Sequence, residues 1–111
     1  MDSKLLYSGS EGMKHKVSWN RITSESEWTY IGEGSNINMT MVLNSINCHF
    51  SNPLLYVCWT RQNSFEATKE HVEIGIKELL GRQDFFIWDS KFKLVIEFNK
   101  IGVMRLGQVN G

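Results

Sequence analysis

The sequence has little of several features that would point to a particular class of protein. Its 111 residues include one proline and two cysteines, and 12 Lys and Arg balance 12 Asp and Glu, so the formal net charge is zero. Nucleic-acid-binding proteins usually carry a basic excess, because phosphate contacts supply much of their affinity. No apolar run approaches the ~20 residues that span a bilayer, and the first residues contain no apolar segment typical of a secretion signal. We therefore expect no nucleic-acid partner, no membrane association, and a cytoplasmic location with reduced thiols.

Recognisable reactive motifs are missing as well. Zinc sites usually show paired ligands at short spacing, whereas Cys48, His49 and Cys58 form no such pair. The glycine-rich stretch at residues 32–36 is followed by an alternating pattern that predicts a strand, whereas a phosphate loop leads into a helix. We interpret this stretch as a turn or loop connection. The sequence thus predicts no catalytic residue, no cofactor and no metal ligand.

The two cysteines allow two interpretations. If Pro53 lies near the centre of a hairpin, Cys48 and Cys58 lie roughly opposite each other on neighbouring strands. They are then either buried thiols that act as small apolar side chains or the two halves of a cross-strand disulfide.

Aromatic residues and strand-like alternation are what the sequence does have. Six Phe, four Trp and three Tyr occur in a chain long enough for one domain with its own core. Apolar and polar residues alternate with the period of a strand, or form short apolar runs, at residues 13–22, 27–31, 37–43, 54–60, 85–88, 92–98 and 103–109. Asn99–Gly102 fits a turn that ends in a glycine bulge.

One helix is expected after residue 63. Asn63 and Glu66 have the spacing of a capping box, and Gly81 occupies a typical position for a C-terminal cap. The apolar residues of this segment recur at helical spacing, at Phe65, Val72, Ile76, Leu79 and Leu80.

These elements predict an α+β fold with two layers. We expect a curved, mostly antiparallel sheet with one main amphipathic helix, at about residues 64–80, packed on it. Residues 13–111 form this single domain, and residues 1–12 form a loosely ordered lead-in, with a short edge strand as the alternative.

The aromatic surplus suggests where function lies. One helix cannot cover a large sheet, and Trp, Tyr and Met are enriched at the cores of interfaces. We therefore consider three uses of the aromatic side chains: plain core packing, a partner surface, and a ligand cavity. The possible interface or pocket positions are Trp19, Trp28, Trp59, Trp88, Tyr56, Met39 and Met41.

The leading hypothesis is a non-enzymatic interaction domain that forms a homo-oligomer, such as a dimer, or binds a protein partner. The order of elements resembles that of several small bacterial immunity or inhibitor proteins, but only in layout, and no residue carries the resemblance. An inhibitor or immunity role is thus one form of the hypothesis. The alternatives are a small-molecule binder with an aromatic-lined cavity between helix and sheet, and a small enzyme whose polar groups converge only in three dimensions.

Overall fold

The computed structural model describes residues 2–110. Within this range the chain forms three α-helices, which are α1 (Ser3–Met13), α2 (Met39–His49) and α3 (Val72–Ile76). Two short 3-10 helices are η1 (Lys14–Lys16) and η2 (Gly34–Asn36). The strands are β1 (Val17–Trp19), β2 (Thr29–Tyr30), β3 (Leu54–Cys58), β4 (Phe65–Thr68), β5 (Phe85–Asp89), β6 (Leu94–Asn99) and β7 (Val103–Val109).

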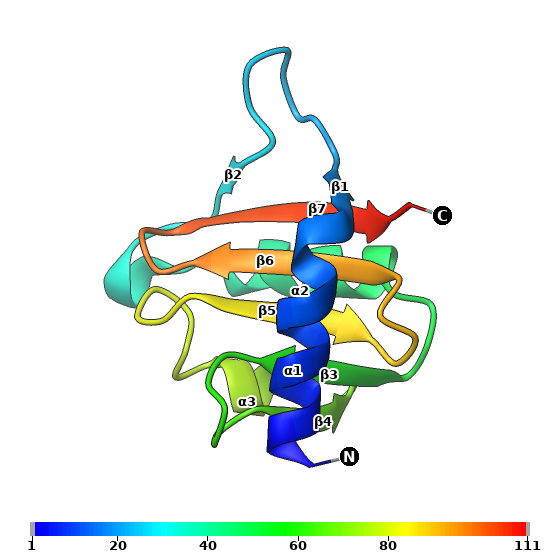
Figure 1. Cartoon of the computed structure of the whole chain (residues 1–111). Helices are drawn as coiled ribbons and strands as arrows, with labels where there is room; N and C mark the ends of the chain where they lie inside the picture. Colours follow the sequence, from blue (N-terminus) through cyan, green and yellow to red (C-terminus); the bar gives the residue numbers. More distant parts are fainter. Residues whose placement is uncertain (1, 111) are drawn as a thin grey trace.

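All the strands belong to one antiparallel sheet with the order β1-β7-β6-β5-β3-β4. Strand β2 also pairs with β7, so β1 and β2 share one edge of the same strand. β1 pairs with residues 107–109 and β2 with residues 103–104. The β1–β2 loop (residues 20–28) leaves this edge and projects beyond the sheet (Figure 1).

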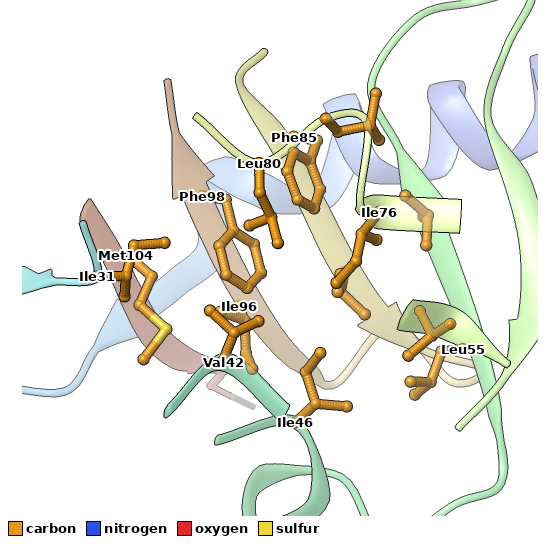
Figure 2. Packing of buried hydrophobic residues seen from close by; sticks show 14 of the residues in the cluster. Ile31, Val42, Ile46, Leu55, Ile76, Leu80, Phe85, Ile96, Phe98 and Met104 are labelled. Carbon is orange, nitrogen blue, oxygen red and sulfur yellow. The ribbon is translucent and has the colours of Figure 1, made fainter. Parts of the chain in front are cut away.

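Helices lie on both faces of the sheet. α1 crosses the strands on one face, whereas α2 lies behind the sheet in the same view (Figure 1). Because side chains alternate along a strand, Ile87 and Ile96 belong to the larger core cluster with α2 and α3, and Trp88 and Val95 belong to the cluster beneath α1. Figure 2 shows the larger cluster, in which Val42 and Ile46 of α2 pack near Ile96.

The prediction of an α+β fold built on an antiparallel sheet with a packed helix is confirmed, and so are the terminal strands and their turn. Gly102 has φ of 101° and its N–H donates to the Asn99 carbonyl at 3.0 Å. The sheet, however, is covered from two sides and not from one, because α1 was not expected and because α2 replaces a predicted strand.

The predicted main helix at residues 64–80 is wrong in extent. Residues 65–68 form edge strand β4, and helix is confined to Val72–Ile76, followed by turns. Pairing with β3, with Phe65 opposite Val57, outweighs the local helical pattern. The apolar stripe itself was informative, since Val72, Ile76, Leu79 and Leu80 are all buried.

The predicted strand at residues 37–43 is also wrong, because this segment leads into α2. The Asn38 side chain caps the helix by accepting a hydrogen bond from the Met41 N–H at 3.1 Å. Val42, Ile46 and Phe50 are buried at intervals of four residues, so the helical period decided the structure although alternate residues 37–43 are also apolar.

Residues 1–12 were expected to be a loosely ordered lead-in, but residues 3–13 form α1. Asp2 caps this helix, with its side chain accepting from the Lys4 N–H at 2.7 Å. Leu6 is fully buried on the sheet, and the ring of Phe92 lies so close to Gly9 that any larger residue there would collide with it. The Ser and Gly residues that suggested a loose segment instead allow close packing. The strand predicted from Met13 accordingly begins only at Val17.

Candidate functional site

Two of the aromatic residues predicted for an interface or pocket lie in the core. Trp88 is fully buried beneath α1, and its indole Nε1 donates to Ser10 Oγ at 2.9 Å. Tyr56 is 6% exposed, and its ring lies 5.3 Å from that of Phe92. Both side chains hold α1 on the sheet and do not reach the surface.

Three more of the predicted positions are partly buried and pack against the larger core cluster. Trp59 is half-buried at the end of β3, where its Nε1 donates to the Asn63 carbonyl at 2.8 Å. Met39 and Met41 lie in the first turn of α2 and pack against the larger core cluster. These residues therefore contribute to the packing of the larger core cluster.

Trp19 and Trp28, in contrast, meet over one side chain of β7. The guanidinium carbon of Arg105 lies 4.0 Å from the centre of the Trp19 ring and 4.5 Å from that of Trp28. A guanidinium at these distances is attracted by the negative faces of both rings. Arg105 thus joins β7 to both ends of the β1–β2 loop.

The same guanidinium forms two ion pairs. Its Nε donates to Glu97 Oε1 at 2.8 Å, and its Nη1 donates to Glu27 Oε1, also at 2.8 Å. Glu97 lies opposite Arg105 on β6, and Glu27 belongs to the loop. The three side chains are between 18% and 32% exposed, so water screens these pairs less than it screens surface pairs.

Gly107 allows Trp19 to reach this position. Gly107 pairs with Trp19 across β7 and β1. A Cβ at residue 107 would lie 2.5 Å from Val17 Cγ1 and 2.8 Å from Trp19 Cε3, so any side chain would displace β1. The absence of a side chain on this side of β7 lets the indole lie against the strand beside Arg105.

We call the surface around Arg105 the open face, and we define it by Trp19, Trp28, Tyr30, Phe86, Glu97 and Arg105. Phe86, Glu97 and Arg105 are direct neighbours across β5, β6 and β7, and they lie on the same side of the sheet as α1. Tyr30, at the end of β2, is 60% exposed. α1 covers Trp88 and Val95 on this side, whereas the six residues of the open face stay at least partly exposed.

Two shallow hollows border the open face. One, of about 270 Å³, lies between η1 and the sheet and is lined by Lys14, His15, Trp19, Phe86, Glu97 and Arg105. The other, of about 320 Å³, is lined by Trp28, Asn99, Ile101 and Val103. Ile101 is 67% exposed, so apolar surface continues from the second hollow onto the β6–β7 turn.

Sequence reasoning missed the charged members of this site, which are Arg105, Glu97 and Glu27. A signal was present for two of them. The turn predicted at Asn99–Gly102 fixes the register of the β6–β7 hairpin, and that register places Glu97 opposite Arg105. Because these opposite charges face each other across the hairpin between apolar neighbours, they indicate an ion pair on the sheet surface. No local pattern indicated Glu27, which reaches the pair through the β1–β2 loop.

The two cysteines lie on different elements and are both free. Cys48 is exposed on α2, so the predicted strand pairing of Cys48 with Cys58 is wrong. Cys58 is buried on β3, and its Sγ donates to the Leu6 carbonyl at 3.4 Å. Burial raises the pKa of this thiol to about 12, which keeps it protonated and unreactive near neutral pH.

The glycine-rich loop at residues 32–36 leads into a helix after all, because α2 follows it. Two amides at its C-terminal end are nevertheless used within the fold: the Asn36 N–H donates to the Glu33 carbonyl, and the N–H of Asn38, just after the loop, donates to the Ile31 carbonyl. The stretch is thus a loop connection, as predicted, but it leads from β2 into α2 and not into the predicted strand. Among residues 2–110, no group of three or more His, Cys, Asp and Glu side chains is placed to hold a metal ion. No helix in the same range is long and apolar enough to cross a bilayer.

Comparison with known proteins yields no match, whether with the models of protein families, with curated proteins or with solved structures.

Proposed function

We propose that this chain is a non-enzymatic interaction domain that docks another protein chain on the open face. The observation that carries the proposal is the group of accessible aromatic residues around the Arg105 ion pairs, on a part of the sheet that α1 leaves uncovered. Trp, Tyr and Arg are the residues that most often dominate binding energy at protein interfaces.

The rigidity of the site supports this role. Arg105 is held by two carboxylates and two rings, so the Trp19 and Trp28 side chains are ordered before any partner arrives. Binding then costs less side-chain entropy than it would with mobile residues, which each lose roughly 0.5–1.5 kcal/mol on ordering.

The β1–β2 loop extends the same surface. Thr23 Oγ1 accepts hydrogen bonds from the N–H groups of Glu25 and Ser26, and the Trp28 N–H donates to Ser26 Oγ. The loop therefore has an internal structure of its own, and it projects beyond the edge of the sheet (Figure 1). Its Ile22 side chain is 54% exposed. A projecting, ordered loop beside an aromatic face suits a concave partner.

The interior offers less support for the small-molecule alternative. Side chains of α2 and α3 pack against β3, β5, β6 and β7 in the space between helix and sheet that such a cavity would need (Figure 2). We therefore base the proposal on the surface. We place the interaction in the cytoplasm, which the two unpaired cysteines support.

Site-specific crosslinking tests the proposal. The photoreactive amino acid p-benzoylphenylalanine replaces Tyr30 in the open face and, as a matched control, Ile74, which is 75% exposed on α3. The two chains are irradiated in the cells that produce the protein. We expect a discrete protein adduct from position 30 and none of the same mass from position 74. An adduct of twice the chain's mass indicates self-association, and any other mass indicates a different partner.

Competition makes this test specific. An excess of the wild-type chain should suppress the adduct, whereas an excess of the Phe86→Glu variant should not, because a charge in the open face opposes docking of an apolar surface. Equal adducts from positions 30 and 74, or equal suppression by both competitors, would contradict the proposal. Circular dichroism of the Phe86→Glu chain confirms that the competitor is folded.

A further inference from the structure

Helix α1 rests on the sheet through a narrow stripe that includes small residues. Leu6, Gly9, Ser10 and Met13 face the cluster beneath α1, at the i, i+3, i+4, i+7 spacing of one helix face. Of the eleven residues of α1, only Leu6 and Ser10 are buried. Leu6 is therefore the only apolar side chain of this helix that is fully buried.

Hydrogen bonds also hold α1 in place. Ser10 Oγ accepts from Trp88 Nε1 at 2.9 Å, and at the first turn Ser3 Oγ accepts from the Ser64 N–H at 2.8 Å. All four of these groups become accessible to water when the helix leaves the sheet. Because they then exchange one hydrogen-bond partner for another, the loss of these bonds on release is largely offset.

The α1 segment has little tendency to be helical by itself. Five of its eleven residues are Ser or Gly, at positions 3, 8, 9, 10 and 12, and both types have lower helix propensity than Ala or Leu. An isolated helix shorter than about 12 residues is marginal in water even with a favourable composition. The segment therefore regains conformational entropy when it leaves the sheet, and this gain favours release.

The rest of the fold is built without α1. Within residues 2–110, the larger core cluster takes its side chains from other elements, and all seven strands pair with one another and not with α1. Figure 1 shows α1 as a layer of its own across the strands. Its one connection to the sheet is η1, which leads into β1. The helix can thus leave through a change at this connection, with no strand pair broken.

We propose that α1 is a releasable cover, which leaves the sheet as a unit while the sheet and the larger core cluster stay folded. Its release uncovers Trp88, Tyr56 and Val95, and Phe86 of the open face packs against the same cluster. The uncovered surface therefore continues the open face. The release requires no partner, so it does not rest on the proposed function.

The attached form of α1 predominates. Trp88 and Val95 are fully buried beneath the helix, and their exposure to water costs free energy in proportion to their apolar area. The released form is consequently a minor species, and a reactive probe beneath the helix is needed to detect it.

Cys58 is such a probe, since its thiol lies beneath α1 and donates to the Leu6 carbonyl at 3.4 Å. Replacing the exposed Cys48 by serine leaves Cys58 as the only thiol. Its labelling by N-ethylmaleimide is followed by mass spectrometry at urea concentrations below the unfolding transition. Release of α1 exposes much less surface than global unfolding, so it depends much less on urea.

We expect a labelling rate that hardly changes at low urea and rises steeply only near the transition. Without urea, labelling should be at least about tenfold faster than global unfolding allows, which corresponds to about 1.4 kcal/mol. The rate that global unfolding allows is obtained from the unfolding transition of the same chain, followed by tryptophan fluorescence.

Hydrogen exchange separates the release of α1 from other openings that reach Cys58. Trp88 and Ile87 are neighbours on β5, but the indole of Trp88 lies beneath α1 and Ile87 belongs to the opposite cluster. We expect the Trp88 indole N–H to exchange with the same weak urea dependence as the labelling. The backbone N–H of Ile87 should exchange with the steep dependence of global unfolding.

Two glycines of α1 provide a matched pair of variants. A Cβ at residue 12 meets no atom within 4 Å, whereas a Cβ at residue 9 lies 2.6 Å from Cζ of the Phe92 ring. Both changes to alanine raise the helix propensity equally, but only Gly9→Ala disturbs the contact with the cluster beneath the helix. In the Cys48→Ser chain, we expect Gly9→Ala to be labelled roughly tenfold faster than Gly12→Ala.

Labelling that follows the urea dependence of global unfolding throughout would overturn the proposal, because α1 would then be inseparable from the sheet. Equal labelling of the two glycine variants would do the same, as would exchange of the Ile87 N–H together with the Trp88 indole. The urea series uses a chain with an unchanged α1, so it decides the question even if Gly9→Ala unfolds the protein. The crosslinking at residue 30 judges the proposed function separately.

Discussion

Arg105 and Glu97 face each other across the β6–β7 hairpin, with 2.8 Å between Arg105 Nε and Glu97 Oε1. This pair lies on a sheet face whose other members are mostly apolar, and it holds the β1–β2 loop through Glu27. Arg105 therefore attaches the loop to the last strand, in addition to the hydrogen bonds within the loop.

Replacing Arg105 by alanine should lower the free energy of unfolding by about 2–3 kcal/mol. The change leaves two partly buried carboxylates without their shared cation and removes the contacts with both indoles. Urea unfolding followed by tryptophan fluorescence measures the loss. Arg82→Ala, at an ion pair whose side chains are 69% and 80% exposed, is the control and should cost at most about 0.5 kcal/mol. Similar losses for the two variants would show that the Arg105 contacts contribute little.

Gly107→Ala should destabilise the β1 edge. The added methyl group would lie 2.5 Å from Val17 Cγ1 and 2.8 Å from Trp19 Cε3, so β1 or the indole must move at a cost of about 1–3 kcal/mol. Gly12→Ala is the matched control, since a Cβ at that helical position meets no atom within 4 Å. We expect Gly12→Ala to stabilise the chain by up to about 1 kcal/mol through helix propensity. Thermal unfolding of both variants checks the opposite signs.

Ser10→Ala should weaken the attachment of α1. It removes the acceptor of the fully buried Trp88 Nε1–H, and an unsatisfied buried donor costs about 1–3 kcal/mol. Ser8→Ala, at an exposed position of the same helix, should be neutral or slightly stabilising. Hydrogen exchange of the Trp88 indole, read by nuclear magnetic resonance, should accelerate only in the Ser10 variant. Unchanged exchange would mean that α1 is held by its apolar contacts alone.

The burial of Cys58 should lower the free energy of unfolding in alkaline solution. Burial raises the pKa of its thiol to about 12, from 9.0 in the unfolded chain. Between these values the native state retains a proton that the unfolded state releases, so the free energy of unfolding falls as the pH rises from about 9 toward about 12. Below pH 9 this contribution is fully present. Cys58→Ala should lack this component, so the difference in stability between wild type and variant should shrink over that range. A constant difference would contradict the burial effect.

The strands of the second half of the sheet could be predicted because local pattern and tertiary environment agree there. In β5, Ile87 and Trp88 face opposite core clusters, and in β6, Val95 and Ile96 do the same. These strands are therefore apolar on both faces, and turn residues flank them. The glycine of the Asn99–Gly102 turn also adopts the expected positive φ. In such segments the local pattern and the tertiary packing both favour a strand.

The first half of the chain could not be predicted in the same way, because its apolar residues fit both the period of a strand and the period of a helix. Met39 and Met41 fit a strand, whereas Val42 and Ile46 fit a helix, and only packing on the sheet selects the second. Similarly, Phe65 fits both the helical stripe and the edge strand that it forms. The candidate site was found only in part for a related reason: Trp19 and Trp28 could be named as surface aromatics, but the side chain that unites them comes from the far end of the chain.

The outer edge of β7 pairs with two short strands in succession. β1 and β2 occupy this edge one after the other, so the chain departs from the strand and rejoins it without altering the neighbouring pairs. Residues 21–25 lie between the Asn20 N–H, which donates to the Leu106 carbonyl, and the contacts of Glu27 and Trp28 with Arg105. We therefore expect their length and composition to be changeable while the strand register and the helices are retained. Grafting new sequences into this segment should therefore leave the strand pairs of β7 in place.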